Sequence, residues 1–224
     1  MREIVLDTET TGLDPASGHR IVEIGCVELV NHVATERTYW QYVNPERDIP
    51  EEAFNVHGLS GDFLAKHPVF ADVAEAFLDF IGDAPLVIHK ADFDMGFINA
   101  ELKAVGREPL ARERAVDTVR LARRKFPGAP ASLDALCRRF QIDNSGRELH
   151  GALKDARLLA YVYLELVGGR QPGLELAGDK AKAASDSGAA PRARREPRPH
   201  APSAEEMQAH AAFLDKLKEP VWRA

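Results

Sequence analysis

The fold and the site both follow from residues 1–12, which read Met-Arg-Glu-Ile-Val-Leu-Asp-Thr-Glu-Thr-Thr-Gly. The Ile-Val-Leu run at 4–6 is apolar on both faces, which predicts a buried strand. Asp7 and Glu9 follow two residues apart. Because side chains alternate along a strand, both carboxylates are expected to point to the same face.

This acidic pair permits two interpretations. Two neighbouring carboxylates at the end of a buried strand repel each other and lose hydration, which is costly unless a cation neutralises them. Oxygen ligands of this kind suit Mg²⁺ or Mn²⁺ better than zinc. The alternative is a strand that runs out into a solvated acidic turn, since Thr10, Thr11 and Gly12 are turn-prone. The segment alone leaves both interpretations open.

The composition is that of an ordinary soluble globular protein, with 224 residues, 45% hydrophobic and 29% charged. This length predicts one full-sized domain and an extra segment. No apolar run approaches the roughly 18 residues of a membrane span, and the charged start at Arg2 and Glu3 is unlike a signal peptide. Cys26 and Cys137 lie in apolar-periodic stretches, so we expect buried thiols in a reducing, cytoplasmic environment.

The net charge of −6 argues against a protein that grips duplex DNA over a wide surface by itself. If the chain acts on nucleic acid, metal ions must mediate the contact locally, or a partner must hold the substrate.

The order of predicted elements indicates an α/β fold. Strands over 20–30 and 33–43, joined by a turn at 31–32, predict an antiparallel hairpin beside the first strand. Shorter strands at 86–88 and 115–117 are separated by helical periodicity. Helices are predicted over 51–57, 68–81, 91–105, 118–126, 132–140 and 150–167. Three strands followed by alternating helices and strands predict a mixed sheet flanked by helices.

Composition divides the chain into a folded domain over 1–169, a flexible linker over 170–202 and a terminal segment over 203–224. A capping box at 203–206 predicts a helix over 203–219. Its apolar stripe consists of Met207, His210, Leu214 and Leu217. A helix this short is marginal alone in water, so the stripe needs a groove on its own domain or on another protein.

Two later acids interrupt apolar helix faces. Asp94 lies three and four residues before Phe97 and Ile98, and therefore shares their face. The alternative is that Asp94 complements the helix N-terminus. Asp92 is the better candidate for that capping role, which leaves Asp94 as the acid expected to point inward.

Asp155 shows the same anomaly, three and four residues before Leu158 and Leu159. His150 precedes it by five residues, which on a straight helix would separate the two by about 140°. We therefore expect His150 on the loop or first turn, over the site, unless it is a surface or capping residue. Four acids and one His fit a pair of divalent ions that stabilise phosphodiester hydrolysis, with a neutral His as the base.

Three segments, at 7–12, 89–97 and 150–155, resemble the exonuclease motifs of the DEDDh 3′→5′ exonucleases. The likeness is closest to the proofreading subunits of bacterial DNA polymerase III. It extends over residues 1–169, and the closing Trp-Arg-Ala also resembles that group. Lys90 departs from the family, which usually has Asn there, and it could touch the DNA backbone or tune the metals.

The resemblance implies a ribonuclease H-like fold and two divalent metal ions, Mg²⁺ or Mn²⁺, with Asp7 bridging both. The implied metal ligands are Asp7, Glu9, Asp94 and Asp155, and the implied general base is His150. The residues implied to contact substrate are Asp7, Glu9, Thr10, Thr11, Gly12, His57 and Phe93. The product would be a deoxynucleoside 5′-monophosphate. A mispaired end would be preferred because unpairing it costs less before it enters a single-strand site.

The resemblance also gives the tail a role. Residues 203–224 would dock on the polymerase alpha subunit through Met207, Leu214, Leu217 and Trp222. The linker would let the nuclease reach the primer end, since tethering raises the effective concentration. The segment 171–176 resembles a sliding-clamp-binding peptide with anchors Gln171, Leu174 and Leu176, although it also fits an ordinary linker with stray leucines.

Two other functions compete with this one. A freestanding DEDDh exonuclease acting on RNA or short oligonucleotides is disfavoured by the linker and terminal helix. A non-catalytic binding module on a nuclease fold is disfavoured because all five expected catalytic residues are present.

Overall fold

The computed structural model describes residues 1–145, 149–169 and 201–216. The chain forms two compact units, Met1–Gly173 and Leu174–Ala224. The predicted partner contacts Gln171, Leu174, Leu176, Leu217 and Trp222 lie outside the described residues. None of the helices in the described ranges is long and apolar enough to cross a membrane.

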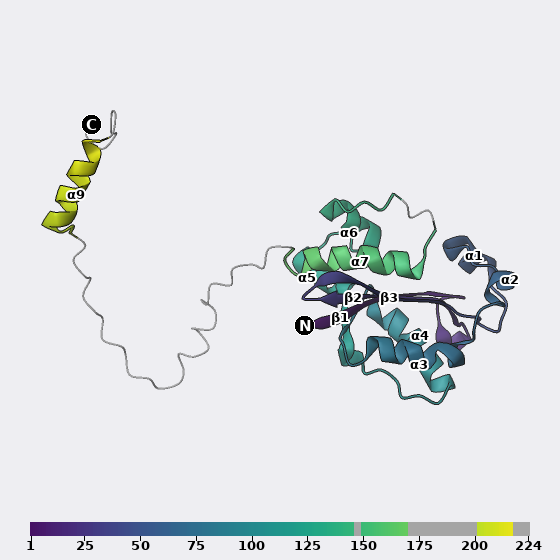
Figure 1. Ribbon diagram of the computed structural model, residues 1–224. Helices are drawn as coiled ribbons and strands as arrows, with labels where there is room; N and C mark the ends of the chain where they lie inside the picture. Colours follow the sequence, from purple (N-terminus) through teal and green to yellow (C-terminus); the bar gives the residue numbers. More distant parts are fainter. Residues whose placement is uncertain (146–148, 170–200, 217–224) are drawn as a thin grey trace, which may run out of the picture. The chain divides into compact units, whose positions relative to one another are not determined.

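Strand β1 (Arg2–Thr10) is the centre of a five-stranded sheet with the order β3-β2-β1-β4-β5 (Figure 1). The other strands are β2 (Ile21–Val30), β3 (Val33–Tyr42), β4 (Leu86–Ile88) and β5 (Ala115–Asp117). Strands β2 and β3 are antiparallel, whereas β4 and β5 run parallel to β1. Asn31 and His32 both have positive φ, as a two-residue hairpin turn requires. The predicted hairpin and mixed sheet are thus confirmed.

The α-helices lie close to their predicted positions, except for the one-turn helix α2, which was not predicted. The first unit contains α1 (Glu51–His57), α2 (Gly61–Leu64), α3 (Phe70–Ile81), α4 (Ala91–Ala104), α5 (Thr118–Lys125), α6 (Leu133–Phe140) and α7 (Ala152–Leu166), and two short 3₁₀ turns, η1 (Pro15–Ser17) and η2 (Arg112–Arg114). The second unit contains α9 (Ala204–Leu214). Ser203 caps α9 in the predicted capping box, and the helix ends at Leu214, while residues 217–219 of the predicted span lie outside the described residues.

Two helix starts were predicted too early. Helix α3 begins at Phe70 because the preceding residues are extended: Pro68 accepts a hydrogen bond from the Asn44 N–H, and Val69 bridges to Asn44. Helix α7 begins at Ala152 because Gly151 is extended, with φ of −158°.

Helices cover both faces of the sheet, with α3 and α4 on one side and α5, α6 and α7 on the other (Figure 1). The even-numbered residues of β1, such as Ile4 and Leu6, pack with Phe77 of α3. Val5 belongs to the opposite core, with Leu159 of α7. A strand buried on both faces explains the continuous apolar run at 4–6.

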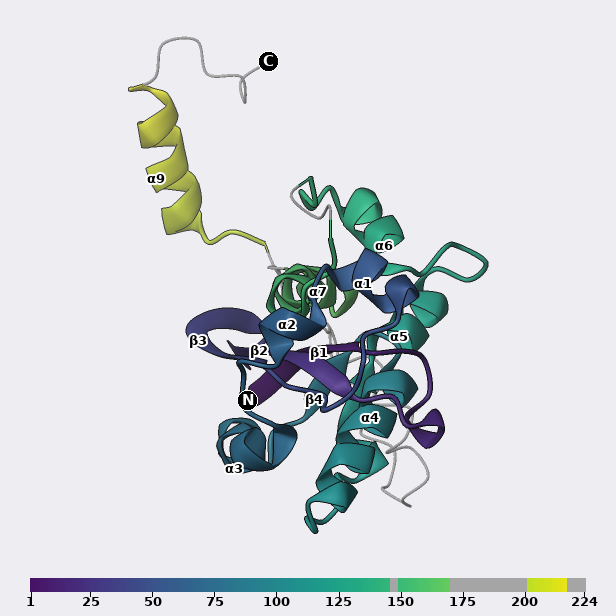
Figure 2. The same ribbon diagram turned by 90° about the vertical axis from the view of Figure 1, so that its right-hand side faces the viewer.

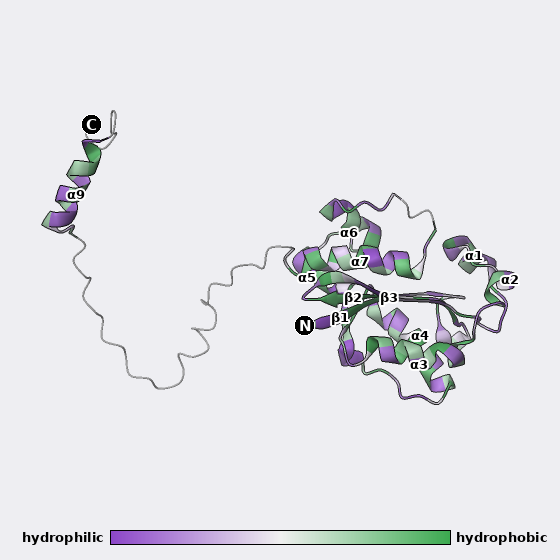
Figure 3. Cartoon of the chain, in the orientation of Figure 1, coloured by the Kyte–Doolittle hydropathy of each residue, from purple (hydrophilic) through white to green (hydrophobic). Residues whose placement is uncertain are grey.

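The colouring by hydropathy in Figure 3 shows hydrophobic and hydrophilic residues mixed on α3, α4 and α7, as expected of helices buried on one side. Cys26 and Cys137 are both buried, as predicted. In Figure 2 the C-terminal end of β1 faces the viewer, with α1, α4 and α7 grouped around it. The three sequence motifs come together at this end of the strand.

Candidate active site

Strand β1 directs two acids toward α7. Asp7 and Glu9 share the face of Val5, whose core partners come from α7. Glu9 is 8% exposed, and Asp7 is half-buried. In the antiparallel register, Asp7 lies opposite Gly25 of β2 and Glu9 lies opposite Glu23.

Gly25 lets the start of α7 lie directly against the sheet. A Cβ at Gly25 would lie 2.2 Å from the carbonyl carbon of Ala152 and from the backbone nitrogen of Leu153. Any larger residue would therefore push α7 away from β2. The close approach buries Asp155, in the first turn of α7, to 2% exposure.

Glu23 holds the same helix by its N-terminus. Its Oε2 accepts a hydrogen bond of 3.0 Å from the Ala152 N–H, and its Oε1 accepts one of 2.6 Å from Trp40 Nε1–H. Burial raises the pKa of the Glu23 carboxyl, and these two hydrogen bonds partly offset that shift. The motifs did not identify Glu23 or Gly25. The available signal was an acid within an otherwise apolar strand.

His150 lies on the segment before α7, as expected. Its backbone N–H donates to the Val56 carbonyl of α1, 3.0 Å away, which ties this segment to α1. Its Nδ1 lies 3.2 Å from Asp155 Oδ2. Donor atoms of Glu9, His150 and Asp155 all lie within 4.8 Å of one another. An imidazole and two carboxylates from two elements therefore meet at one point.

Asp94 reaches the site from the opposite face. It lies in the first turn of α4 and is 3% exposed, so the inward orientation is confirmed. Its Oδ1 accepts hydrogen bonds from the Thr8 N–H at 3.0 Å and from Thr8 Oγ1 at 2.8 Å. Burial raises the pKa of the Asp94 carboxyl to about 7, although the hydrogen bonds from Thr8 and the charge of Lys90 act to lower it.

Asp92 does not cap α4, contrary to the prediction. The N-cap of α4 is Lys90, in the left-handed region, and its side chain makes no capping hydrogen bond. Asp92 is exposed and forms ion pairs with Arg112 at 3.2 Å and Arg120 at 3.3 Å. These partners come from η2 and α5, so the local sequence of α4 could not reveal them.

The five motif residues line one cavity of about 290 Å³. Its other lining residues are Thr8, Leu13, His89, Lys90, Phe93 and Leu133. Four carboxylates and an imidazole form a donor set that fits divalent cations with a preference for oxygen ligands, and a cation would offset the cost of burying these acids.

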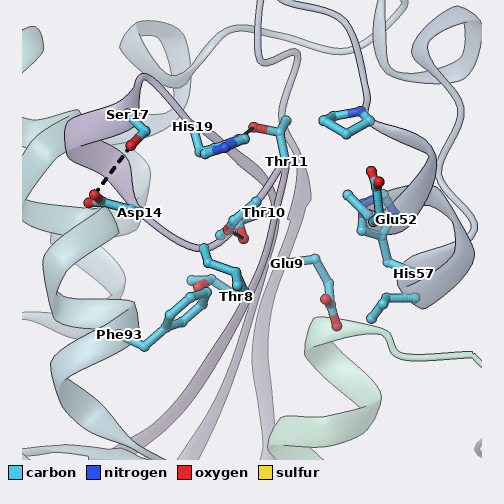
Figure 4. Close-up of a pocket in the computed structure, with 15 residues that line it drawn as sticks. Thr8, Glu9, Thr10, Thr11, Asp14, Ser17, His19, Glu52, His57 and Phe93 are labelled. Atoms are coloured by element: carbon cyan, nitrogen blue, oxygen red, sulfur yellow. Dashed lines mark hydrogen bonds between the residues drawn. The ribbon is translucent and has the colours of Figure 1, made fainter.

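A second cavity of about 570 Å³ adjoins the first and shares Thr8, Glu9, Leu13 and Phe93 with it. Thr10, Thr11, Gly12 and His57 also line it. Figure 4 shows Phe93 and His57 on opposite sides of this pocket, with Glu9 between them. Its volume is in the range of small-molecule sites.

His57 lines the larger cavity and carries a buried hydrogen-bond donor. Its Nδ1 accepts from the Leu59 N–H at 3.0 Å, so the neutral ring carries its proton on Nε2. Nε2 is buried and has no hydrogen-bond partner in the part of the chain that the structure describes. Burial lowers the pKa of His57, which keeps the ring neutral.

Comparison with known proteins agrees with this geometry. The exonuclease family RNase_T matches residues 4–163. The DNA polymerase III subunit epsilon of Rickettsia felis is 56% identical over 179 residues, 79% of this chain and 78% of that protein. The subunit of the same name from Rickettsia typhi is 49% identical over 222 residues, 97% of each chain.

A solved structure described as the nuclease domain of 3′hExo, a DEDDh family member, bound to rAMP, has a TM-score of 0.64. It covers 74% of this chain and 91% of that chain at 20% identity, and shares the ribonuclease H-like fold. The family match and the identities to the Rickettsia proteins decide the assignment. The chain belongs to the exonuclease family and, within it, to the epsilon subunits of DNA polymerase III.

Proposed function

We propose that this protein is the 3′→5′ proofreading exonuclease of DNA polymerase III, which hydrolyses mispaired or single-stranded 3′ ends of DNA to deoxynucleoside 5′-monophosphates. The observation that carries the proposal is a pair of adjoining cavities. One is lined by four acids and His150, and the other has the size of a nucleoside site. The protein would act in the cytoplasm, on the 3′ ends of DNA.

Two divalent ions, Mg²⁺ or Mn²⁺, would be held by Asp7, Glu9, Asp94 and Asp155. When bound, they stabilise the charge that develops on the phosphate during hydrolysis. The burial of Glu9, Asp94 and Asp155 supports the assignment, since adjacent ionised acids out of water need a compensating charge.

His150 is the proposed general base. With Nδ1 at hydrogen-bond distance from Asp155, Nε2 accepts a proton from the attacking water. The water oxygen forms a bond to phosphorus, and the bond from phosphorus to the 3′ oxygen of the preceding nucleotide breaks. That oxygen takes a proton from solvent and becomes the new 3′ end. Asp155 orients the ring and stabilises the imidazolium that forms.

The larger cavity would hold the terminal nucleoside. The ring of Phe93 offers a stacking surface, and His57 Nε2–H can donate to an oxygen of the nucleotide. Since the terminal nucleotide must leave its base pair to enter, a mismatch reduces the cost of entry.

The C-terminal segment would bind the polymerase alpha subunit. On α9, Met207 and Phe213 are 60% and 56% exposed, which leaves large apolar side chains available for a partner's groove. Binding of the sliding clamp by Gln171, Leu174 and Leu176 is part of the same proposal. The 97% coverage of the Rickettsia typhi subunit supports a shared tail.

The test is digestion of a 3′-labelled primer–template, either matched or mispaired at its end, with Mg²⁺ or with EDTA. We expect mononucleotide release that requires the metal, is faster from the mispaired end, and is lost in Asp7→Ala and His150→Gln variants that remain folded. Removal of residues 203–224 should abolish coelution with the alpha subunit but leave hydrolysis intact. Unchanged coelution would favour a freestanding exonuclease, and absence of hydrolysis would favour a binding module.

A further inference from the structure

Lys90 occupies a position that local physical chemistry disfavours. Its backbone is left-handed, with φ of 68° and ψ of 57°, a conformation that costs free energy for residues other than Gly, Asn and Asp. It is the N-cap of α4, yet its side chain makes no capping hydrogen bond. Its ammonium also lies at the positive end of the helix dipole. Residues that break several local rules are expected where function requires them.

The surroundings of Lys90 indicate what function this residue serves. Its side chain is exposed and lines the acidic cavity. Its Nζ lies 5.8 Å from the centre of the Phe93 ring, within cation–π range. Over the described residues Lys90 has no ion pair within 4.0 Å, whereas the neighbouring Arg112 and Arg120 are both paired with Asp92. The Lys90 charge is therefore available to an anionic ligand.

The arrangement of the two cavities indicates which phosphate of a bound DNA strand would lie near Lys90. They meet at Thr8, Glu9, Leu13 and Phe93, while Lys90 lines only the acidic cavity. With the terminal nucleoside in the larger cavity, the scissile phosphate lies at the junction, beside the acids. The strand then continues over the acidic cavity, past Lys90. We propose that Lys90 binds the phosphate immediately 5′ of the scissile one, an inference that rests on the proposed function.

Salt dependence tests this contact. Single-strand binding weakens with a slope of about 0.7 in log affinity against log salt for each phosphate contact. Between 50 and 200 mM salt, KM for a single-stranded oligonucleotide should rise in both the parent and Lys90→Met. The fold increase should be about 2.6 times smaller in Lys90→Met than in the parent, while kcat is retained. Lys90→Asn, which suits the left-handed backbone, should lose the same salt dependence and guards against misfolding of the Met variant.

The matched control is Lys103→Met. Lys103 is exposed in the last turn of the same helix, roughly 20 Å from Lys90 along its axis. The Lys103→Met substitution removes the same charge as Lys90→Met, and the salt dependence of KM in this variant should equal that of the parent.

A substrate with one phosphate locates the contact. The nitrophenyl ester of thymidine 5′-monophosphate has no upstream phosphate, so its KM should be the same in Lys90→Met and in the parent. An equal loss on this ester and on the oligonucleotide would place Lys90 on the scissile phosphate and overturn the inference. So would an unchanged salt slope in both Lys90 variants. If the parent degrades no single-stranded DNA, the proposed function fails first.

Discussion

The two faces of β1 hold their acids by different means. On the α7 face, Asp155 is positioned by backbone packing on Gly25 and by the hydrogen bond from Ala152 to Glu23. On the α4 face, Asp94 is held by two hydrogen bonds from Thr8 and is buried deeply enough that its pKa is about 7. The position of Asp155 depends on close backbone packing, whereas the ability of Asp94 to bind a cation depends on its ionisation. A packing mutation should therefore affect the first acid most, and a change of pH the second.

The largest effect is expected from Gly25→Ala. The added Cβ would overlap the backbone of α7 and displace Asp155 and His150, and a shift of about 1 Å at a reacting group can cost 100-fold. We expect kcat/KM to fall by about 100-fold and Tm by roughly 3–10 °C. Gly61→Ala is the control, because its Cβ would meet only Ile49, at 4.0 Å, and should leave activity unchanged. Equal activity in both variants would contradict the role of packing.

Glu23→Gln should have a smaller effect. The amide has one acceptor where the carboxylate has two, so either Trp40 or Ala152 loses its partner. We expect kcat to fall by about 10-fold, as for other residues that orient catalytic groups, with little change in KM. Glu28→Gln, on the same strand but paired with Arg2 and Arg37, is the control. If Glu23→Gln is as active as Glu28→Gln, the hydrogen bond between Glu23 and the start of α7 does not position the catalytic groups.

The α4 face should respond to pH. In the metal-free protein burial raises the pKa of Asp94 to about 7, so below that pH a proton competes with the metal for this carboxylate, and at subsaturating Mg²⁺ kcat/KM should fall as pH drops through this range. Thr8→Val removes the hydroxyl that lowers this pKa, and should move the acid limb of the profile to higher pH. An unmoved limb would assign the titration to another group.

The raised pKa of Asp94 also predicts how the stability of the metal-free protein changes with pH. The usual pKa of the group is 3.8 and the folded value is about 7, so its contribution to stability is complete below about 4 and is lost as pH rises to about 7. Asp94→Asn should therefore raise Tm above pH 7 in EDTA, by on the order of 5 °C. The Tm increase caused by Mg²⁺ should shrink in this variant. Thermal unfolding at pH 6 and pH 8 measures both effects.

The smallest effect is expected from His57→Phe. The substitution keeps an aromatic ring but removes both the buried Nε2–H donor and the Nδ1 acceptor of the Leu59 N–H, and loss of one hydrogen bond to the substrate, of about 1 kcal/mol, corresponds to roughly a fivefold rise in KM. The kcat should be retained, since His57 lines the larger cavity and not the acidic one. A fall in kcat alone would assign His57 to the chemical step.

The sequence was most informative where the signal is local. Alternation placed Asp7 and Glu9 on one face, and helical periodicity turned Asp94 inward. The roles of Glu23 and Gly25 and the arginine partners of Asp92 could not be predicted, because they depend on which residues lie opposite one another across the sheet or between elements. A helix start set by an extended residue, as at Gly151, is likewise decided by tertiary contacts and not by propensity.

The alternation of β1 has a consequence for how this family can change. Asp7 and Glu9 serve one face of the strand, while Thr8, between them, serves the other. Inserting or deleting one residue between 4 and 9 would exchange the faces for every position beyond it, even with the sheet intact. Loops elsewhere can grow or shrink, but the length of this strand cannot drift during evolution without ending hydrolysis.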